Sequence, residues 1–157
     1  MMTTERDVDA WDSCFNKESG WYPSLERGLH GLTVAQANWR LDGKEMNTIY
    51  ELVNHILFYK STLLSGLTGT GDAPTSDTSF NNDLAVNTED EWKETVAELN
   101  NIHSRIREKL ATMSEHELQN ESEGVPISQW VSDLVRHDIY HTGQIIFIRK
   151  LQGSWTA

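Results

Sequence analysis

Two histidines four residues apart, His137 and His141, lie in the sequence Arg-His-Asp-Ile-Tyr-His-Thr-Gly-Gln near the end of the chain. In an α-helix, that spacing places both imidazoles on one face, one turn apart. Apolar residues recur around them at alternating steps of three and four, which predicts that this face is buried. The predicted seam consists of Ile127, Trp130, Leu134, His137, His141, Gln144, Ile148, Leu151 and Trp155. Two such imidazoles can supply half of the ligands of a metal ion.

A pair of buried histidines also has an ordinary structural explanation. An imidazole in apolar surroundings needs a partner, because an unpaired buried polar group costs about 1–3 kcal/mol. Backbone carbonyls or carboxylates of neighbouring helices could supply that partner as well as a metal could. The pair alone therefore leaves a metal site and hydrogen-bonded core histidines as two open interpretations.

A catalytic metal site usually takes three ligands from the protein and leaves room for water or substrate. Residues 142–157, after His141, contain no His, Asp, Glu or Cys, so a third ligand has to come from upstream. His55 is the first candidate, because it is central in a predicted buried helix. His103 is the rival, since it interrupts an apolar seam in the next predicted helix. A lone histidine in such a seam is, however, more often a hydrogen-bonded core residue.

Two other metal motifs fit less well. The segment from His137 to His141 matches the zinc-protease pattern with Asp138 in place of glutamate, but those enzymes take their third ligand from after the motif. Di-iron carboxylate bundles need Glu-x-x-His pairs on two helices. No glutamate stands three residues before His55, His137 or His141.

Four helical segments are predicted, at residues 5–29, 48–67, 88–113 and from 126 onward, and almost nothing is typical of a strand. Gly20 and Pro23 are able to kink or divide the first segment. The residues expected on or near its buried face are Trp11, Cys14, Phe15, Trp21, Leu25 and Leu29.

The starts of the second and third helices carry capping boxes, in which Thr48 precedes Glu51 and Thr88 precedes Glu91 by three residues. Between these helices, residues 69–87 are too polar to pack and long enough to carry the chain along a bundle. Four amphipathic helices predict an all-α, four-helix bundle, and 157 residues fit a single domain over 1–157.

The composition excludes several classes of partner. The formal charge is −11, with 13 basic residues scattered among 24 acidic ones, which argues against nucleic acid and against an anionic membrane surface. The first 12 residues have no apolar stretch of signal-peptide length, and the longest apolar run near the end is only 145–148. The single cysteine, Cys14, cannot form an internal disulfide, which fits a reducing compartment. We therefore expect a soluble, cytoplasmic protein.

Two segments resemble the DinB/YfiT-like superfamily of metal-binding four-helix bundles. They are Glu-Leu-Val-Asn-His-Ile at 51–56 and His-Asp-Ile-Tyr-His-Thr-Gly-Gln-Ile at 137–145, and the Gln-Ala-Asn-Trp-Arg segment at 36–40 is similar to that family's linker. The resemblance implies that His55, His137 and His141 are the metal ligands and that His103 is not. It also implies an up-down-down-up bundle, with the long loop crossing between the second and third helices, and a homodimer.

The resemblance also implies a class of function. Characterised relatives include metal-dependent transferases and isomerases that use small thiols such as bacillithiol or mycothiol. The expected function is thus a metal-dependent S-transferase that activates a low-molecular-weight thiol, bacillithiol, mycothiol or one like glutathione, for attack on an electrophile. The alternative is a non-catalytic metal-binding bundle with a ligand-binding or interaction role.

Three imidazole ligands suit such chemistry. They are neutral, so a divalent ion keeps its full charge and open positions; it lowers the pKa of bound water toward ~7 and deprotonates a coordinating thiol. Imidazole suits several metals, of which Zn or Ni is expected first, with Co, Fe, Mn and Cu as alternatives.

Three residues are candidates for a substrate pocket beside the metal. Gln144 follows His141 by about one turn and could bond a ligand or substrate, unless it is a core amide bonded to a neighbouring helix. Tyr59 shares a face with His55, where an aromatic core contact is the default. Glu51 could orient a ligand or act as a base, but its capping box already explains it. No residue stands out as a general base.

The second helix predicts an interface. It carries apolar or aromatic residues on more of its circumference than one bundle core can cover, and exposed apolar patches of that kind usually mark an interface. We therefore expect a two-fold homodimer that uses this helix, with or without a neighbouring one. The alternative is that the long loop or the first helix covers the excess.

Overall fold

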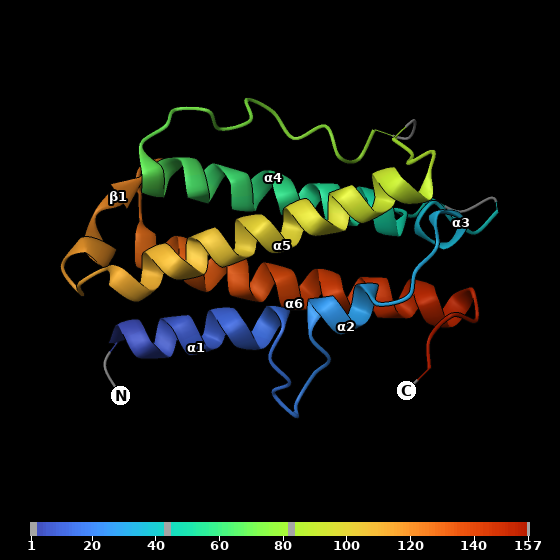
Figure 1. Ribbon diagram of the computed structural model, residues 1–157, viewed down its shortest axis with the longest axis horizontal. Coiled ribbons are helices and arrows are strands. Elements are labelled where there is room, and N and C mark those ends of the chain that lie inside the picture. Colours follow the sequence, from blue (N-terminus) through green and yellow to red (C-terminus); the bar gives the residue numbers. More distant parts are fainter. Residues whose placement is uncertain (1–2, 43–44, 82–83, 157) are drawn as a thin grey trace.

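Four long helices pack side by side in the computed structural model, which describes residues 3–42, 45–81 and 84–156 (Figure 1). They are α1 (Thr3–Phe15), α4 (Ile49–Thr68), α5 (Glu89–Thr112) and α6 (Ile127–Leu151). Helices α4 and α1 each pack against both α5 and α6. Helices α1 and α6 run in one direction and α4 and α5 in the other, so the predicted four-helix bundle and its up-down-down-up order are confirmed.

Short elements connect the long helices. Helices α2 (Leu25–Leu29) and α3 (Val34–Ala37) precede α4, and a 3-10 turn, η1 (Glu117–Gln119), follows α5. Strands β1 (Glu121–Ser122) and β2 (Val125–Pro126) then form a two-residue antiparallel hairpin directly before α6. This hairpin follows the third predicted helix, in a stretch where no alternating apolar pattern exists to indicate a strand.

The predicted capping boxes form at both helix starts. Thr48 and Glu51 exchange side-chain and backbone hydrogen bonds before α4, and Thr88 and Glu91 do the same before α5. Each box satisfies two backbone N–H groups that the first turn of a helix leaves unpaired. Helix α4 ends at Gly69, whose positive φ of 66° is a backbone conformation that glycine adopts without strain.

The first predicted helix is divided into α1 and α2. Gly20, with a φ of 77°, and Pro23 lie in the intervening segment, and Ser24 caps the start of α2. Helix α2 then continues along α6. The expectation that Trp21 lies on the buried face is wrong, because this residue sits in the break and its side chain is 93% exposed.

The described parts of the crossover loop, residues 69–81 and 84–87, run along α4 from one end of the bundle to the other (Figure 1). The length and path of the loop are as predicted, but the expectation that it is too polar to pack is wrong. Ser79 and Val86 are buried. The side-chain amide of Asn38 donates to the Val86 carbonyl at 2.6 Å and accepts from its N–H at 3.1 Å, so these polar contacts and the burial of Val86 in the hydrophobic core together hold the loop.

The predicted seam of α6 is buried only in part. Ile127, Leu134 and Ile148 belong to the core. Leu151 is 47% exposed, and Trp155 lies beyond the end of the helix. The prediction that these two residues continue the buried seam is therefore wrong. Within residues 3–42, 45–81 and 84–156, no helix combines the length and apolar character that crossing a membrane would require.

Candidate metal centre

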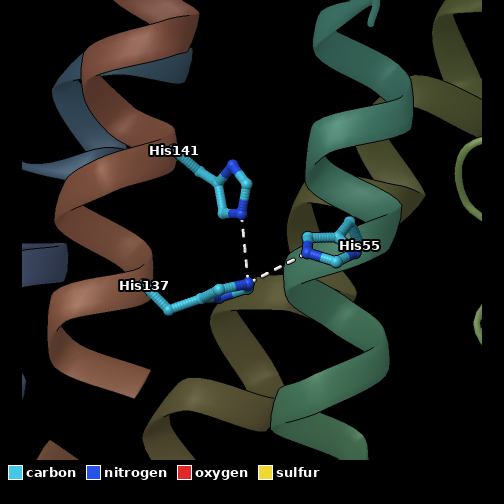
Figure 2. Close-up of side chains that lie close together, drawn as sticks. All are labelled: His55, His137 and His141. Atoms are coloured by element: carbon cyan, nitrogen blue, oxygen red, sulfur yellow. Dashed lines mark hydrogen bonds between the residues drawn. The ribbon is translucent and has the colours of Figure 1, made fainter. Parts of the chain in front are cut away.

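The three predicted ligands come from two antiparallel helices that pack against each other. His55 lies in the first half of α4, and His137 and His141 lie one turn apart near the middle of α6. Figure 2 shows the three rings pointing toward one another between the two helices. The structure thus brings together residues that are far apart in the sequence.

The Nε2 atoms of the three rings converge. His137 Nε2 lies 3.0 Å from His55 Nε2 and 3.0 Å from His141 Nε2, and the ligand atoms all lie within 4.8 Å of one another. Two histidine nitrogens bound to one ion at about 2.0–2.1 Å, with an angle of about 90–110° between them, would be roughly 2.9–3.4 Å apart. The two 3.0 Å separations lie within this range.

Acceptors hold the outer nitrogens of two rings. His55 Nδ1 lies 2.6 Å from Asp77 Oδ2, and His141 Nδ1 lies 2.6 Å from Gln144 Oε1. The amide nitrogen of Gln144 faces the Tyr140 hydroxyl at 3.4 Å, which agrees with this orientation of the amide. Because carboxylate and amide oxygens accept hydrogen bonds, each Nδ1 carries a proton, which leaves each Nε2 free to present a lone pair to a metal ion.

Hydrogen bonds alone account for only one of the two 3.0 Å contacts. His55 and His141 both present lone pairs, and His137 Nε2 can direct a single proton at one of them. His137 Nδ1 is buried and has no hydrogen-bond partner among the described residues, so it does not fix the tautomer of this ring. A cation between the three nitrogens would bind all three lone pairs at once. The donor set therefore fits a metal ion.

The surroundings keep the imidazoles of His137 and His141 uncharged. Burial lowers the pKa of His137 to about 4, and the neighbouring His141 and His55 add to this effect. Burial also lowers the pKa of His141, while its hydrogen bond to Gln144 acts in the opposite direction. A ligating histidine must be unprotonated, so at neutral pH these two rings are in the form that binds metal.

Aromatic side chains enclose part of the group. The Tyr59 ring lies 5.0 Å from the His55 ring and 5.2 Å from the His137 ring, edge-on to both. Phe80, from the crossover loop, stacks on His55 at 4.4 Å. Such walls reduce the access of water and so strengthen electrostatic interactions within the site.

Two of the three residues predicted for the substrate pocket adjoin the histidines. Gln144 is bonded to His141, and Tyr59 packs on two of the rings. Glu51 is engaged elsewhere: its Oε2 accepts from the Thr48 N–H at 2.7 Å and its Oε1 pairs with Arg40 at 2.7 Å. The capping-box explanation of Glu51 is confirmed. Contact of any of these residues with a substrate stays a prediction.

His103, the rival ligand, lies in the core instead. Its ring stacks between Trp11 and Phe15, at 4.8 and 3.9 Å, and its Nδ1 lies 3.2 Å from Lys60 Nζ. Burial, with the charges of Lys60 and Arg107, lowers the pKa of His103 to about 2. His103 is thus a neutral core histidine, as its position in an apolar seam predicted.

Two residues near the site, Asp77 and Lys60, were not identified from the sequence. Asp77 lies in a loop without periodicity, and only its two-residue spacing to Ser79, typical of an Asx turn, marks it. Lys60 is the one basic residue in a helix predicted to be buried almost all round, which is a signal in itself because lysine is almost never fully buried without a partner. Its partner is Asp138, on α6.

The fold and the histidine geometry agree with a comparison of the sequence with known families. The sequence profile of the DinB superfamily matches residues 22–145, well over half of the chain. This chain belongs to the DinB superfamily. The part that matches the DinB profile includes all three histidines and the crossover loop. Comparisons with curated proteins and with solved structures gave no significant match.

As a DinB-superfamily bundle with three convergent imidazoles, the chain could hold one divalent metal ion. His55, His137 and His141 would supply three nitrogen ligands from two helices. Three protein ligands leave coordination positions for water or another small molecule.

Proposed function

We propose that the chain binds one divalent transition metal ion through His55, His137 and His141 and uses it to activate a small thiol for attack on an electrophile. One observation carries the metal site: three Nε2 atoms converge, and acceptors hold the outer nitrogens of two of the rings. Membership of the DinB superfamily supports it. The thiol follows from the resemblance to thiol-dependent transferases and from the chemistry of the donor set.

The chain's own residues have distinct roles in this proposal. Asp77 and Gln144 orient two of the rings, while Tyr59 and Phe80 limit access of water. When bound, a divalent ion held by three neutral imidazoles acidifies a coordinating thiol and so supplies a thiolate near neutral pH. Zn or Ni suits these ligands first, with Co, Fe or Mn as alternatives.

The proposed reaction balances without a redox partner. The thiol releases its proton to solvent, its sulfur forms a bond to the electrophilic carbon, and the leaving group departs with the electron pair of the broken bond. The thiolate is already the nucleophile, so no general base is needed from the chain. This agrees with Asp77, Gln144 and Glu51 being engaged by other protein groups.

The second candidate is a metal-binding bundle without catalysis. The hydrogen bonds of Asp77 and Gln144 to the histidines favour this candidate, because they leave these two polar side chains with little freedom to contact a substrate. Structural metal sites are closed by protein ligands, whereas catalytic sites keep an open position. X-ray absorption spectroscopy of the metal-loaded protein counts the ligands and therefore separates the two candidates.

Metal analysis of purified protein tests the site itself. We expect about one ion per chain in the wild type and near-total loss in a His137→Ala, His141→Ala double variant. The matched control is a double variant of two exposed histidines, His30→Ala and His116→Ala, which should keep its metal. Circular dichroism should show unchanged helicity in both. Undiminished metal in the first variant would overturn the assignment.

Turnover assays test the catalytic part. The metal-loaded protein is incubated with bacillithiol, mycothiol or glutathione and a panel of electrophiles, and loss of free thiol is followed. We expect metal-dependent conjugation for at least one combination of thiol and electrophile. The His137→Ala, His141→Ala double variant should show no such conjugation. A closed metal site without turnover would favour the non-catalytic candidate.

A further inference from the structure

The crossover loop reaches the candidate metal centre through one short segment, residues 77–80. Asp77 Oδ2 accepts a hydrogen bond from His55 Nδ1 at 2.6 Å. Phe80 stacks on the same imidazole, at 4.4 Å between ring centroids. The segment therefore contacts both the nitrogen edge and the face of one predicted ligand.

The carboxylate of Asp77 is itself held in place. Its Oδ1 accepts hydrogen bonds from the backbone N–H of Ser79, at 3.0 Å, and from the Ser79 hydroxyl. Ser79 is buried, so this turn is packed against the bundle. One oxygen thus anchors the side chain in the loop while the other contacts His55, and the carboxylate is oriented before any ion binds.

We propose that Asp77 is a positioning residue for the metal centre and that, through it, metal occupancy stabilises the packed conformation of the crossover loop. The inference rests on the proposed metal site and adds a residue and a coupling to it. No contact between Asp77 and the ion is needed, because Asp77 acts through the His55 imidazole.

Two physical effects support the role of Asp77. A carboxylate that accepts from Nδ1–H fixes the tautomer and orientation of the ring, and it makes Nε2 a stronger donor to a cation. The second effect acts from the metal toward Asp77: a divalent ion on Nε2 withdraws charge from the ring and so strengthens the hydrogen bond from Nδ1–H to the carboxylate. Each partner therefore favours the other.

The charges around the site single out Asp77. Three imidazoles leave the charge of a divalent ion uncompensated. Asp138, next to His137, is already paired with Lys60 at 2.7 Å, and Gln144 is neutral. Among the described residues bonded to the three histidines, Asp77 is the one that carries a negative charge.

Thermodynamic linkage makes the coupling reciprocal. If the packed loop raises metal affinity by some factor, metal binding stabilises the packed loop by the same factor. Loss of the Asp77 carboxylate should thus have two consequences: weaker metal binding, and a loop that no longer responds to metal. A residue that only supported the fold would lower stability without producing either consequence.

The experiment compares Asp77→Asn and Asp77→Ala with the wild type. Zn²⁺ affinity is measured by competition with a chromophoric chelator, and hydrogen exchange of the backbone amides at 78–80 is followed with and without Zn²⁺. Asp72→Asn, an exposed aspartate of the same loop, is the matched control. Because loss of an outer partner of a ligating histidine usually costs about 10–100-fold in affinity, we expect that loss for Asp77→Ala. Asp77→Asn keeps an oxygen acceptor without the charge and should lie in between.

In the wild type and in Asp72→Asn, Zn²⁺ should slow exchange at 78–80, and in Asp77→Ala it should not. The Asn variant, nearly isosteric with Asp, keeps the test valid if the Ala variant unfolds. If the wild type binds Zn²⁺ and both Asp77 variants bind it equally well, this inference is overturned while the proposed metal site stands. A wild type that binds no Zn²⁺, Ni²⁺ or Co²⁺ would overturn both.

Discussion

Lys60 Nζ lies 2.7 Å from Asp138 Oδ2, and both side chains are completely buried. This ion pair joins α4 to α6, the two helices that carry the three histidines, and Asp138 directly follows His137. The ammonium also contacts His103 Nδ1 at 3.2 Å and lies 4.0 Å above the Trp11 ring. An ammonium of α4 that is buried and paired with a carboxylate of α6 constrains how the two helices are rotated against each other.

Removal of Lys60 should strongly destabilise the bundle. Lys60→Met leaves the Asp138 carboxylate buried without its counter-ion, and breaking a buried pair in this way costs about 3–5 kcal/mol. Urea unfolding measures the change. The control is Arg136→Met, which removes an exposed ion pair with Asp133 and should cost at most about 1 kcal/mol.

A double variant tests whether the pair matters through its charge. Lys60→Met combined with Asp138→Leu removes both charges, and we expect it to recover most of the stability lost in Lys60→Met. Equal destabilisation of the single and double variants would mean that packing volume, and not the unpaired carboxylate, causes the loss.

Gln144 should affect metal affinity. Gln144→Leu removes the acceptor for His141 Nδ1–H, so the ring loses its fixed tautomer, and we expect about tenfold weaker Zn²⁺ binding. Gln129→Leu, at an exposed position of the same helix, is the control. If Gln144→Leu leaves metal affinity unchanged and raises the KM for a thiol or electrophile, the residue contacts substrate.

The metal-free protein should lose stability as the pH falls below about 6.5. Burial, helped by the charges of Lys60 and Arg107, lowers the pKa of His103 to about 2, from an ordinary value of 6.5. Between these values the unfolded chain binds a proton that the folded chain does not, so the free energy of unfolding rises with pH. The contribution of His103 is complete above pH 6.5 and shrinks by up to about 1.4 kcal/mol per pH unit below it. His137 acts in the same direction down to pH about 4.

Urea unfolding at pH 7, 6 and 5 in the presence of a chelator checks this dependence. His103→Gln should be less stable at pH 7, because stacking on Trp11 and Phe15 is lost, and its stability should fall less steeply with pH. The exposed His116→Gln serves as control. A slope that is equal in wild type and His103→Gln would contradict the explanation.

Light scattering tests the expected homodimer. Within one chain, the apolar residues of α4 are all at least half-buried, and the crossover loop runs along this helix (Figure 1). The neighbouring α6 therefore offers the better surface for contact between two chains. Tyr140, Phe147 and Leu151 lie on one face of α6 and are 64, 61 and 47% exposed. We expect a mass of twice 17.9 kDa for the wild type and 17.9 kDa for Phe147→Asp. Trp21→Asp, exposed outside this face, should remain a dimer, and a wild-type mass of 17.9 kDa would contradict the expectation.

Local patterns predicted much of this fold. The Thr48 and Thr88 capping boxes located two helix starts, because a capping box depends only on residues within one turn. The four-residue spacing of His137 and His141 predicted that they share a face, which a helix dictates by its period. That His55 completes the group followed from the family resemblance, since periodicity within one helix does not determine which helix it faces.

Contacts between distant segments could not be predicted in this way. Asp77 meets His55 across 22 residues of chain, and Lys60 meets Asp138 across two helices. Both contacts depend on the path of the loop and the rotation of the helices, which no short pattern encodes. Trp21 was misplaced because helical periodicity was extended through Gly20 and Pro23, where the helix in fact breaks.

His55 and His137 are 82 residues apart in the sequence, and their Nε2 atoms are 3.0 Å apart in the fold. An ion bound there would find no such ligand set in the unfolded chain, so its binding energy would add to the stability of the folded state. Above the Kd, each tenfold rise in free metal would contribute about 1.4 kcal/mol. The amount of this protein that a cell maintains would then follow its metal supply, because chains made under metal starvation would unfold more often and be degraded sooner.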